Sequence, residues 1–271
     1  MVVLEYNQLE ELIVRIRDIS GFDFSGYARP SLLRRAGRYL AKNDMNLAEL
    51  LDHIEPGGSI VYELIQELTV NYSEMFRDPE YFKRVRTEVF GYLESYPALR
   101  FWVAGCASGE EAFSMAIMLK EAGLLSRSLI YATDLSNKVL TSAREGVFTL
   151  GNTRTFSESY MQAGGKHSLS DYYHVAYNQA VISPELRKNI VFSLHDLTGD
   201  GVFNEFQFIS CRNVMIYFTL ELRQQVFRLL YDSLSMLGFL CLGKRETLRY
   251  SGLEAHFKII DSTLNIYQKI K

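Results

Sequence analysis

The sequence predicts an α/β protein with a doubly wound, Rossmann-like sheet, an N-terminal all-helical domain and a small inserted antiparallel β-subdomain. Three observations indicate this fold class. Apolar residues recur at helical spacing over about residues 1 to 90. From Leu99 onward, apolar runs of strand length alternate with helical stretches, which is typical of a mainly parallel sheet. Polar and aromatic sequence interrupts this alternation over residues 146–188, where we expect the insertion.

The N-terminal region reads as a bundle of short helices. Its apolar residues follow a helical period, as in Leu9, Leu12, Ile13, Ile16 and then Leu32, Leu33, Ala36, Leu40. Pro56, Gly57 and Gly58 interrupt the pattern. We therefore expect a helical domain with its linker over residues 1–80 and a second domain over residues 81–271.

The second domain contains runs that are apolar on both faces, as buried parallel strands require. They are Arg100–Ala104, Leu129–Thr133, Ile190–Leu194, Phe206–Ser210 and Phe239–Leu242. The end of the chain, Leu264–Ile270, is expected to add a final antiparallel strand.

Composition narrows the class of function. Hydrophobic residues make up 48% of the chain and the net charge is only −3, so a sizeable core is expected and nucleic-acid binding, which needs a basic face, is disfavoured. No apolar run has the roughly 18 residues that span a bilayer, so no membrane insertion is expected. The three cysteines are far apart in the sequence, which fits a reducing cytoplasm and argues against a cysteine-based metal site.

We also expect the protein to be a monomer.

A glycine-rich turn follows the first strand. The segment Ala104–Glu111 reads A-G-C-A-S-G-E-E and leads into a helix, so a ligand can approach the backbone closely at the carboxyl end of a parallel strand. It is not the G-x-G-x-x-G fingerprint, and Glu110 and Glu111 would repel a pyrophosphate. The same acids suit the ammonium group of S-adenosylmethionine. Alternatively, they only stabilise the helix N-terminus.

The second strand ends in Asp134. An acid at this position commonly accepts hydrogen bonds from ribose hydroxyls, which favours an adenosine-containing ligand. Its alternative role is to cap the helix that begins near Ser136. His195 and Asp196 do not suggest a catalytic pair or metal site, because neighbouring strand residues point to opposite faces.

Three motifs carry a resemblance to a known family. Residues 71–78 read N-Y-S-E-M-F-R-D, residues 104–114 read A-G-C-A-S-G-E-E-A-F-S, and residues 211–218 read C-R-N-V-M-I-Y-F. They resemble the T-N-x-T-x-F-F-R, A-G-C-S-T-G-E-E-P-Y-S and C-R-N-V-x-I-Y-F motifs of the CheR-type chemotaxis-receptor glutamate O-methyltransferases. The resemblance extends from about Phe22 to Leu248, including F-D-F-S-G-Y at residues 22–27. It implies that a helical N-terminal domain is followed along the chain by a doubly wound methyltransferase domain.

The resemblance also implies the site. The expected cofactor is S-adenosylmethionine, with S-adenosylhomocysteine as product. Its implied binding residues are Asn71, Ser73, Arg77, Glu111, Asp134, Asp196, Leu197, Arg212 and Asn213. Arg77 and Tyr217 are the implied catalytic residues. Lys244-Arg245-Glu246 departs from the family's usual H-S-E, which makes substrate contacts there uncertain.

The implied chemistry needs no general base. A glutamate with a pKa of about 4.3 is already ionised at neutral pH, so the site must align the carboxylate and exclude water. Arg77 can hold a carboxylate of the cofactor or of the substrate, and the sequence does not distinguish these roles. Tyr217 can steer the acceptor oxygen through its hydroxyl.

A basic helix suggests the substrate. On the predicted helix Ser31–Lys42, Arg34, Arg38 and Lys42 are spaced by four, and Arg35 lies beside them. We expect Arg34, Arg35 and Arg38 to bind the glutamate-rich cytoplasmic helices of chemoreceptors, although a solvated helix face is the simpler interpretation. The alternative function is a catalytically weak S-adenosylmethionine-binding regulatory protein of a signalling complex.

Overall fold

A computed structural model describes residues 4–271 and divides them into two compact units. The first contains the described chain up to Asn71 together with Tyr217–Gln225, and the second contains Tyr72–Ile216 and Val226–Lys271. Within the described residues, no helix is both long and apolar enough to cross a membrane.

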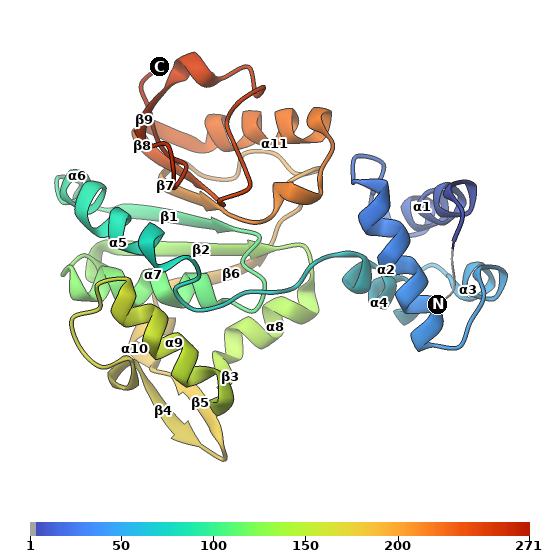
Figure 1. Ribbon diagram of the computed structural model, residues 1–271, viewed down its shortest axis with the longest axis horizontal. Helices are drawn as coiled ribbons and strands as arrows, with labels where there is room; N and C mark the ends of the chain where they lie inside the picture. The colour runs from blue at the N-terminus through green and yellow to red at the C-terminus, as the bar shows by residue number, and fades with distance from the viewer. Residues whose placement is uncertain (1–3) are drawn as a thin grey trace. The chain divides into compact units, whose positions relative to one another are not determined.

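The first unit is a helical bundle. Its helices are α1 (Tyr6–Ser20), α2 (Arg29–Lys42), α3 (Leu47–His53) and α4 (Ser59–Leu68) (Figure 1). Helices α1, α2 and α4 each bury an apolar stripe, as the helical period of the sequence predicts. Asn46 begins α3 with a capping box, because its side chain accepts from the Glu49 N–H and the Glu49 carboxylate accepts from the Asn46 N–H.

A distant segment of the chain completes this unit. The Ala28 N–H donates to the Tyr217 carbonyl at 2.8 Å, and the Thr219 N–H donates to the Gly26 carbonyl at 2.8 Å. A Cβ at Gly26 would lie 2.7 Å from Leu222 Cδ2, so only glycine permits this approach. The F-D-F-S-G-Y motif therefore packs against the end of the C-R-N-V-x-I-Y-F motif.

The second unit is built on a seven-stranded sheet of order β6-β2-β1-β7-β8-β10-β9. Its strands are β1 (Leu99–Ala104), β2 (Ser128–Asp134), β6 (Ile190–Leu194), β7 (Phe206–Cys211), β8 (Leu234–Leu242), β9 (Phe257–Asp261) and β10 (Ile266–Lys269). Pairing is parallel from β6 to β8 and antiparallel among β8, β10 and β9. The structure confirms the predicted fold class.

Helices and 3-10 turns precede these strands or connect them (Figure 1). They are α5 (Pro79–Glu88), α6 (Phe90–Leu93), α7 (Glu110–Glu121), η1 (Leu125–Arg127), α8 (Asn137–Glu145), α9 (Leu150–Gln162), η2 (Leu169–Tyr172), α10 (Pro184–Arg187), η3 (Met215–Tyr217), α11 (Leu220–Ser233) and η4 (Glu254–His256). The boundaries between the two compact units fall inside η3 and inside α11, so each of these elements contributes residues to both units.

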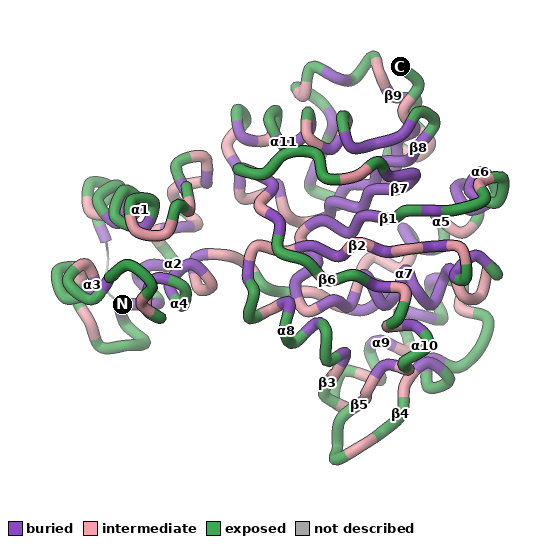
Figure 2. Tube along the Cα trace, turned by 180° about the vertical axis from the view of Figure 1, so that it is seen from behind, coloured by how far each residue is buried: buried purple, intermediate pink, exposed green. Residues whose placement is uncertain are grey.

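The central strands are buried on both faces, as Figure 2 shows for β1 and β7. Phe101 and Val103 belong to a core cluster that includes residues of α5, α7 and α9. Trp102 points to the opposite face because side chains alternate along a strand, and its ring packs against His195 and Phe203. His195 is thus a buried structural residue.

The insertion forms the expected antiparallel sheet, of order β3-β5-β4. Its strands are β3 (Val147–Thr149), β4 (Tyr173–Ala176) and β5 (Gln179–Ile182). Glu121, at the end of α7, ties this subdomain to the main sheet. Its buried carboxylate accepts hydrogen bonds from the hydroxyls of Tyr160 and Tyr172, and from the Lys166 N–H.

Candidate active site

The strand order of the main sheet indicates that the site lies at the carboxyl ends of the central strands. From β1 the chain proceeds to β2 and β6 on one side, whereas β7 and β8 lie on the other. The order therefore reverses between β1 and β7, and α/β sheets bind ligands outside the carboxyl ends of their strands at such a point. Gly105, Asp134 and Arg212 each follow or end one of these strands.

The glycine-rich turn at the end of β1 has a tightly constrained backbone. Gly105 adopts a φ of 71°, and a Cβ there would lie 2.4 Å from Val214 Cγ2. Ala107 also adopts a positive φ, 48°. The turn thus depends on glycine at position 105, and it brings the segment after β7 directly against the turn after β1.

Glu110, the first residue of α7, is buried beside this turn. Its carboxylate accepts from the Ser108 hydroxyl at 2.7 and 2.9 Å, and the Ser73 hydroxyl contributes a further hydrogen bond. Burial raises the pKa of Glu110, and these hydrogen bonds partly offset that effect. Ser73, a predicted cofactor residue, therefore lies beside the glycine-rich turn.

Asp134 organises the neighbouring turn instead of capping the next helix. One carboxylate oxygen accepts from the Ala107 N–H at 2.9 Å, and the other accepts from the N–H groups of Leu135 and Ser136. The N-cap of α8 is Ser136, whose side chain accepts from the Val139 N–H. Burial raises the pKa of Asp134, partly offset by the backbone donors.

Arg212 is the electrostatic centre of the site. Its side chain is 1% exposed and contacts Glu111 at 3.0 Å and Asp78 at 2.8 Å. It also donates to the Arg77 carbonyl at 3.0 Å and lies 4.0 Å from the centre of the Tyr81 ring. Glu111 accepts a further hydrogen bond from the Ser210 hydroxyl. The structure thus brings together two predicted cofactor residues, Glu111 and Arg212, but directs both toward protein groups.

Arg77 differs from Arg212 because its guanidinium is not neutralised by the protein. Within residues 4–271 no carboxylate lies within ion-pair distance of it, and its side-chain contact is with the face of the Tyr72 ring, at 5.6 Å. The next residue, Asp78, is already held by Arg212 and by Lys244 at 3.1 Å. Arg77 is therefore a half-buried cation available for an anionic group.

Glu246 holds Asn213 and was not among the predicted site residues. Its side chain is buried, and its two oxygens accept from four backbone N–H groups, those of Asn213, Val214, Met215 and Gly243, at 2.7–2.9 Å. The signal available in the sequence was the segment Lys244-Arg245-Glu246, which follows β8 and keeps the glutamate of the H-S-E pattern.

Asp196 and Leu197 lie in the turn after β6. The Asp196 carboxylate accepts from the N–H and hydroxyl of Thr198 at 2.8 and 2.7 Å, which fixes the turn, and Leu197 is 8% exposed. Asp196 thus shapes the backbone here, in the manner of Asp134.

The remaining predicted residues belong to the helical unit. Asn71 follows α4 and donates to the Gln66 carbonyl. Arg34 and Arg38 are exposed on α2, whereas Arg35 donates to the carbonyls of Glu67 and Thr69 at the end of α4. Tyr217 is half-buried. Burial lowers the pKa of Arg35, whereas the electrostatic interaction with Tyr217 partly raises it.

The donor set of the second unit fits S-adenosylmethionine. A carboxylate has about four acceptor sites, so Asp134 with its three backbone donors retains one for a ribose hydroxyl. Arg77 offers a cation for the carboxylate of the methionine portion, and the glycine turn allows close approach to the backbone. Among residues 4–271, no group of three or more His, Cys, Asp or Glu side chains is arranged to hold a metal ion.

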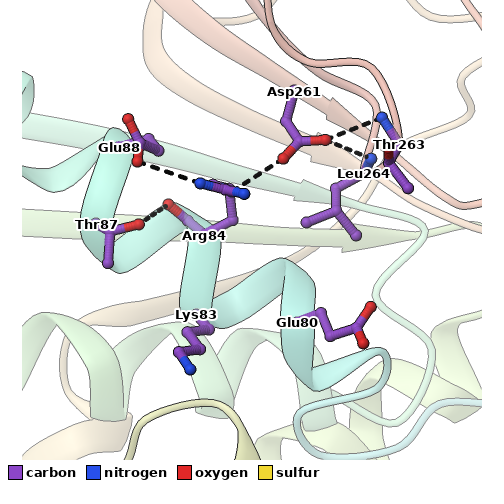
Figure 3. Close-up of a pocket in the computed structure, with 8 residues that line it drawn as sticks. All are labelled: Glu80, Lys83, Arg84, Thr87, Glu88, Asp261, Thr263 and Leu264. Atoms are coloured by element: carbon purple, nitrogen blue, oxygen red, sulfur yellow. Dashed lines mark hydrogen bonds and ion pairs between the residues drawn. The ribbon is translucent and has the colours of Figure 1, made fainter.

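A separate surface pocket of about 570 Å³ lies between α5 and the turn after β9 (Figure 3). Arg84 is paired there with Glu88 and Asp261, so the charges that line the pocket largely neutralise one another. It contains none of the residues that the sequence analysis selected.

Two models of one protein family match most of the sequence. The model "CheR methyltransferase, SAM binding domain" matches residues 71–266, and "CheR methyltransferase, all-alpha domain" matches residues 7–69. A protein named putative methyltransferase Cher3 from Pseudomonas putida is 39% identical, over 92% of this chain and 91% of that protein. A chemotaxis protein methyltransferase from Listeria innocua is 31% identical, over 86% of each chain. These matches confirm S-adenosylmethionine as the cofactor.

Proposed function

Because the chain belongs to the CheR methyltransferase family and is an S-adenosylmethionine-dependent methyltransferase, we propose that it methylates glutamate side chains of chemotaxis receptors. The products are a glutamyl methyl ester and S-adenosylhomocysteine, and the reaction takes place in the cytoplasm. The observation that best supports this proposal is that Arg77 is a cation without a carboxylate partner in the described chain. The neighbouring Arg212, in contrast, is already ion-paired with Asp78 and Glu111.

The reaction requires alignment more than proton transfer. S-adenosylmethionine supplies, when bound, a methyl group on a positively charged sulfur. A glutamate side chain is ionised at neutral pH, so no residue must remove a proton before the carboxylate attacks. The positive and negative charges disappear together, and a site that excludes water therefore favours the transition state.

In the proposal, different residues bind the cofactor and align the acceptor carboxylate. Arg77 and Asn71 bind the polar end of the cofactor, and Asp134 accepts from a ribose hydroxyl. Ser73, Asp196, Leu197 and Asn213 line the adenosine and methionine portions, while Arg212 and Glu111 fix the backbone around Arg77. Tyr217 orients the acceptor carboxylate through its hydroxyl.

The exposed basic residues of α2 provide the substrate contact in the proposal. Arg34 and Arg38 are exposed and one helical turn apart, so they can face acidic groups spaced similarly on a receptor helix. Arg35 acts indirectly, because its guanidinium is engaged with the carbonyls at the end of α4.

A labelling experiment tests the proposal. The protein is incubated with S-adenosylmethionine carrying a radioactive methyl group and with receptor cytoplasmic fragments, and the labelled fragments are then exposed to mild base. Label that is released as methanol supports a carboxyl methyl ester, whereas base-stable label contradicts it. A fragment with its methylation-site glutamates replaced by alanine provides the control.

The same experiment addresses the alternative of a regulatory protein. If S-adenosylhomocysteine binds but no receptor fragment acquires label under any condition, binding without catalysis becomes the better description. Arg77→Ala is expected to abolish most labelling. Near-normal methylation by this variant would remove Arg77 from the proposed machinery.

A further inference from the structure

The backbone around Arg77 is fixed by contacts on both sides. Phe76 is fully buried, and its N–H donates to the Ser114 hydroxyl at 2.9 Å. The Arg77 carbonyl accepts from Arg212. Phe76 and Asp78 have positive φ values of 54° and 59°, so the chain turns sharply on either side of Arg77. The Cα of Arg77 is thus held in place, but these contacts do not orient its long side chain.

Tyr72 supplies the contact that orients this side chain. The Arg77 guanidinium lies over the Tyr72 ring, 5.6 Å from its centre, within the range of a cation–π interaction. No carboxylate of the described chain competes for the guanidinium. Tyr72 is 58% exposed, so packing in the core does not fix the position of its ring.

Glu74 in turn holds the Tyr72 ring. The Tyr72 hydroxyl donates a hydrogen bond to the Glu74 carboxylate, and Glu74 is half-buried. A tyrosine with its ordinary pKa of about 10 is protonated at neutral pH and can donate this hydrogen bond. The hydrogen bond to Glu74 raises the pKa of Tyr72 further. The aromatic ring is therefore fixed at its hydroxyl by Glu74 and offers its face to Arg77.

We infer that Tyr72 is a positioning residue, which together with Glu74 keeps the Arg77 guanidinium oriented to receive the carboxylate of the cofactor. The inference rests on the proposed role of Arg77. Tyr72 acts through Arg77 and makes no contact with the reacting atoms. Orienting the guanidinium before binding lowers the entropy cost of holding the carboxylate, because the arginine side chain is otherwise free to rotate.

A double-mutant cycle tests this inference. The affinity for S-adenosylhomocysteine is measured by calorimetry for the full chain and for Tyr72→Leu, Arg77→Ala and the double variant. We expect Tyr72→Leu to weaken binding about two- to fivefold, as the loss of an exposed cation–π contact predicts. In the Arg77→Ala background the same change should alter affinity by less than a factor of about 1.5, because the group that Tyr72 orients is gone.

Two controls separate positioning from a structural role. Tyr72→Phe keeps the ring but loses the hydrogen bond to Glu74, so its effect should be smaller than that of Tyr72→Leu. Tyr62→Leu, at a tyrosine of similar exposure on α4, should leave the affinity unchanged. In steady-state assays Tyr72→Leu should raise the KM for S-adenosylmethionine while kcat falls little.

The outcomes distinguish this inference from the proposed function. If Arg77→Ala does not weaken binding, the role of Arg77 as the cofactor's carboxylate ligand is wrong and the inference fails with it. If Arg77→Ala weakens binding but Tyr72→Leu does not, only the positioning role is wrong. An equal effect of Tyr72→Leu in both backgrounds would mean that Tyr72 contacts the ligand directly.

Discussion

The guanidinium of Arg212 lies 3.0 Å from the carboxylate of Glu111, although the two residues are 101 positions apart in the chain. This buried pair joins the start of α7 to the segment after β7. Asp78 adds a second carboxylate, so one side chain fixes three segments around the proposed cofactor site. Arg212 therefore serves the site by holding its parts together.

Removing this cation should destabilise the protein strongly. Arg212→Leu would leave Glu111 and Asp78 without their buried partner, and we expect the free energy of unfolding to fall by about 3–5 kcal/mol. Urea denaturation followed by circular dichroism measures this change. Arg84→Leu, which removes a surface cation from two acids, is the control and should cost about 1 kcal/mol or less. Comparable losses for the two variants would contradict the assignment.

Glu246→Gln should weaken cofactor binding more than its effect on stability explains. The amide would turn an NH₂ group toward backbone N–H donors, so we expect the free energy of unfolding to fall by about 1–3 kcal/mol. The segment Asn213–Met215 would then lose its anchor, and affinity for S-adenosylhomocysteine should fall.

The matched control is Glu121→Gln, which alters a buried carboxylate at the C-terminal end of α7. The glycine-rich turn lies at the other end of this helix. It should lower stability comparably and leave cofactor affinity unchanged. If both variants bind S-adenosylhomocysteine as tightly as the unmodified chain at a temperature where all are folded, Glu246 has only a structural role.

Much of the fold could be predicted because its elements follow local sequence patterns. The limits of β6 match the expected Ile190–Leu194. Those of β1 and β7 differ by one residue at one end, and those of β2 by one residue at each end. The start of β8 was wrong: it begins at Leu234, directly after α11, whereas the sequence indicated Phe239. No turn residue separates that helix from the strand, so the change of period could not be recognised.

The site was less predictable because its contacts join distant segments. Motifs identified Arg212 and Glu111, but not that they bind each other. Helical spacing placed Arg35 beside Arg34 and Arg38, and only the packing of α4 reveals that Arg35 is occupied by carbonyl groups. The four donors to Glu246 come from two strand ends, and no local pattern in the sequence indicates such a convergence.

The contribution of Glu121 to stability should depend on pH. Burial acts to raise the pKa of this carboxyl, but hydrogen bonds from Tyr160 and the Lys166 N–H, together with Arg86, lower it overall. A carboxyl whose pKa is lower in the folded state stabilises that state above its unfolded pKa of about 4.3. This contribution disappears as the pH falls through the folded value, because both states are then protonated.

Urea unfolding of the unmodified chain and of Glu121→Gln between pH 7 and pH 3 measures this dependence. The difference in unfolding free energy should be constant above about pH 5 and should shrink as the pH decreases below about 4. A difference that grows on acidification would mean that the folded pKa is raised instead.

The basic residues of α2 should affect the substrate without affecting the cofactor. Replacing both Arg34 and Arg38 by glutamate reverses two exposed charges, so we expect the KM for an acidic receptor fragment to rise about tenfold or more at low salt, and the difference to shrink as salt screens the charges. Affinity for S-adenosylhomocysteine should not change. Arg35→Ala provides the contrast. It should destabilise the helical unit, because the carbonyls at the end of α4 would lose the hydrogen bonds that Arg35 donates. An unchanged KM for the double variant would show that the receptor binds elsewhere on the protein.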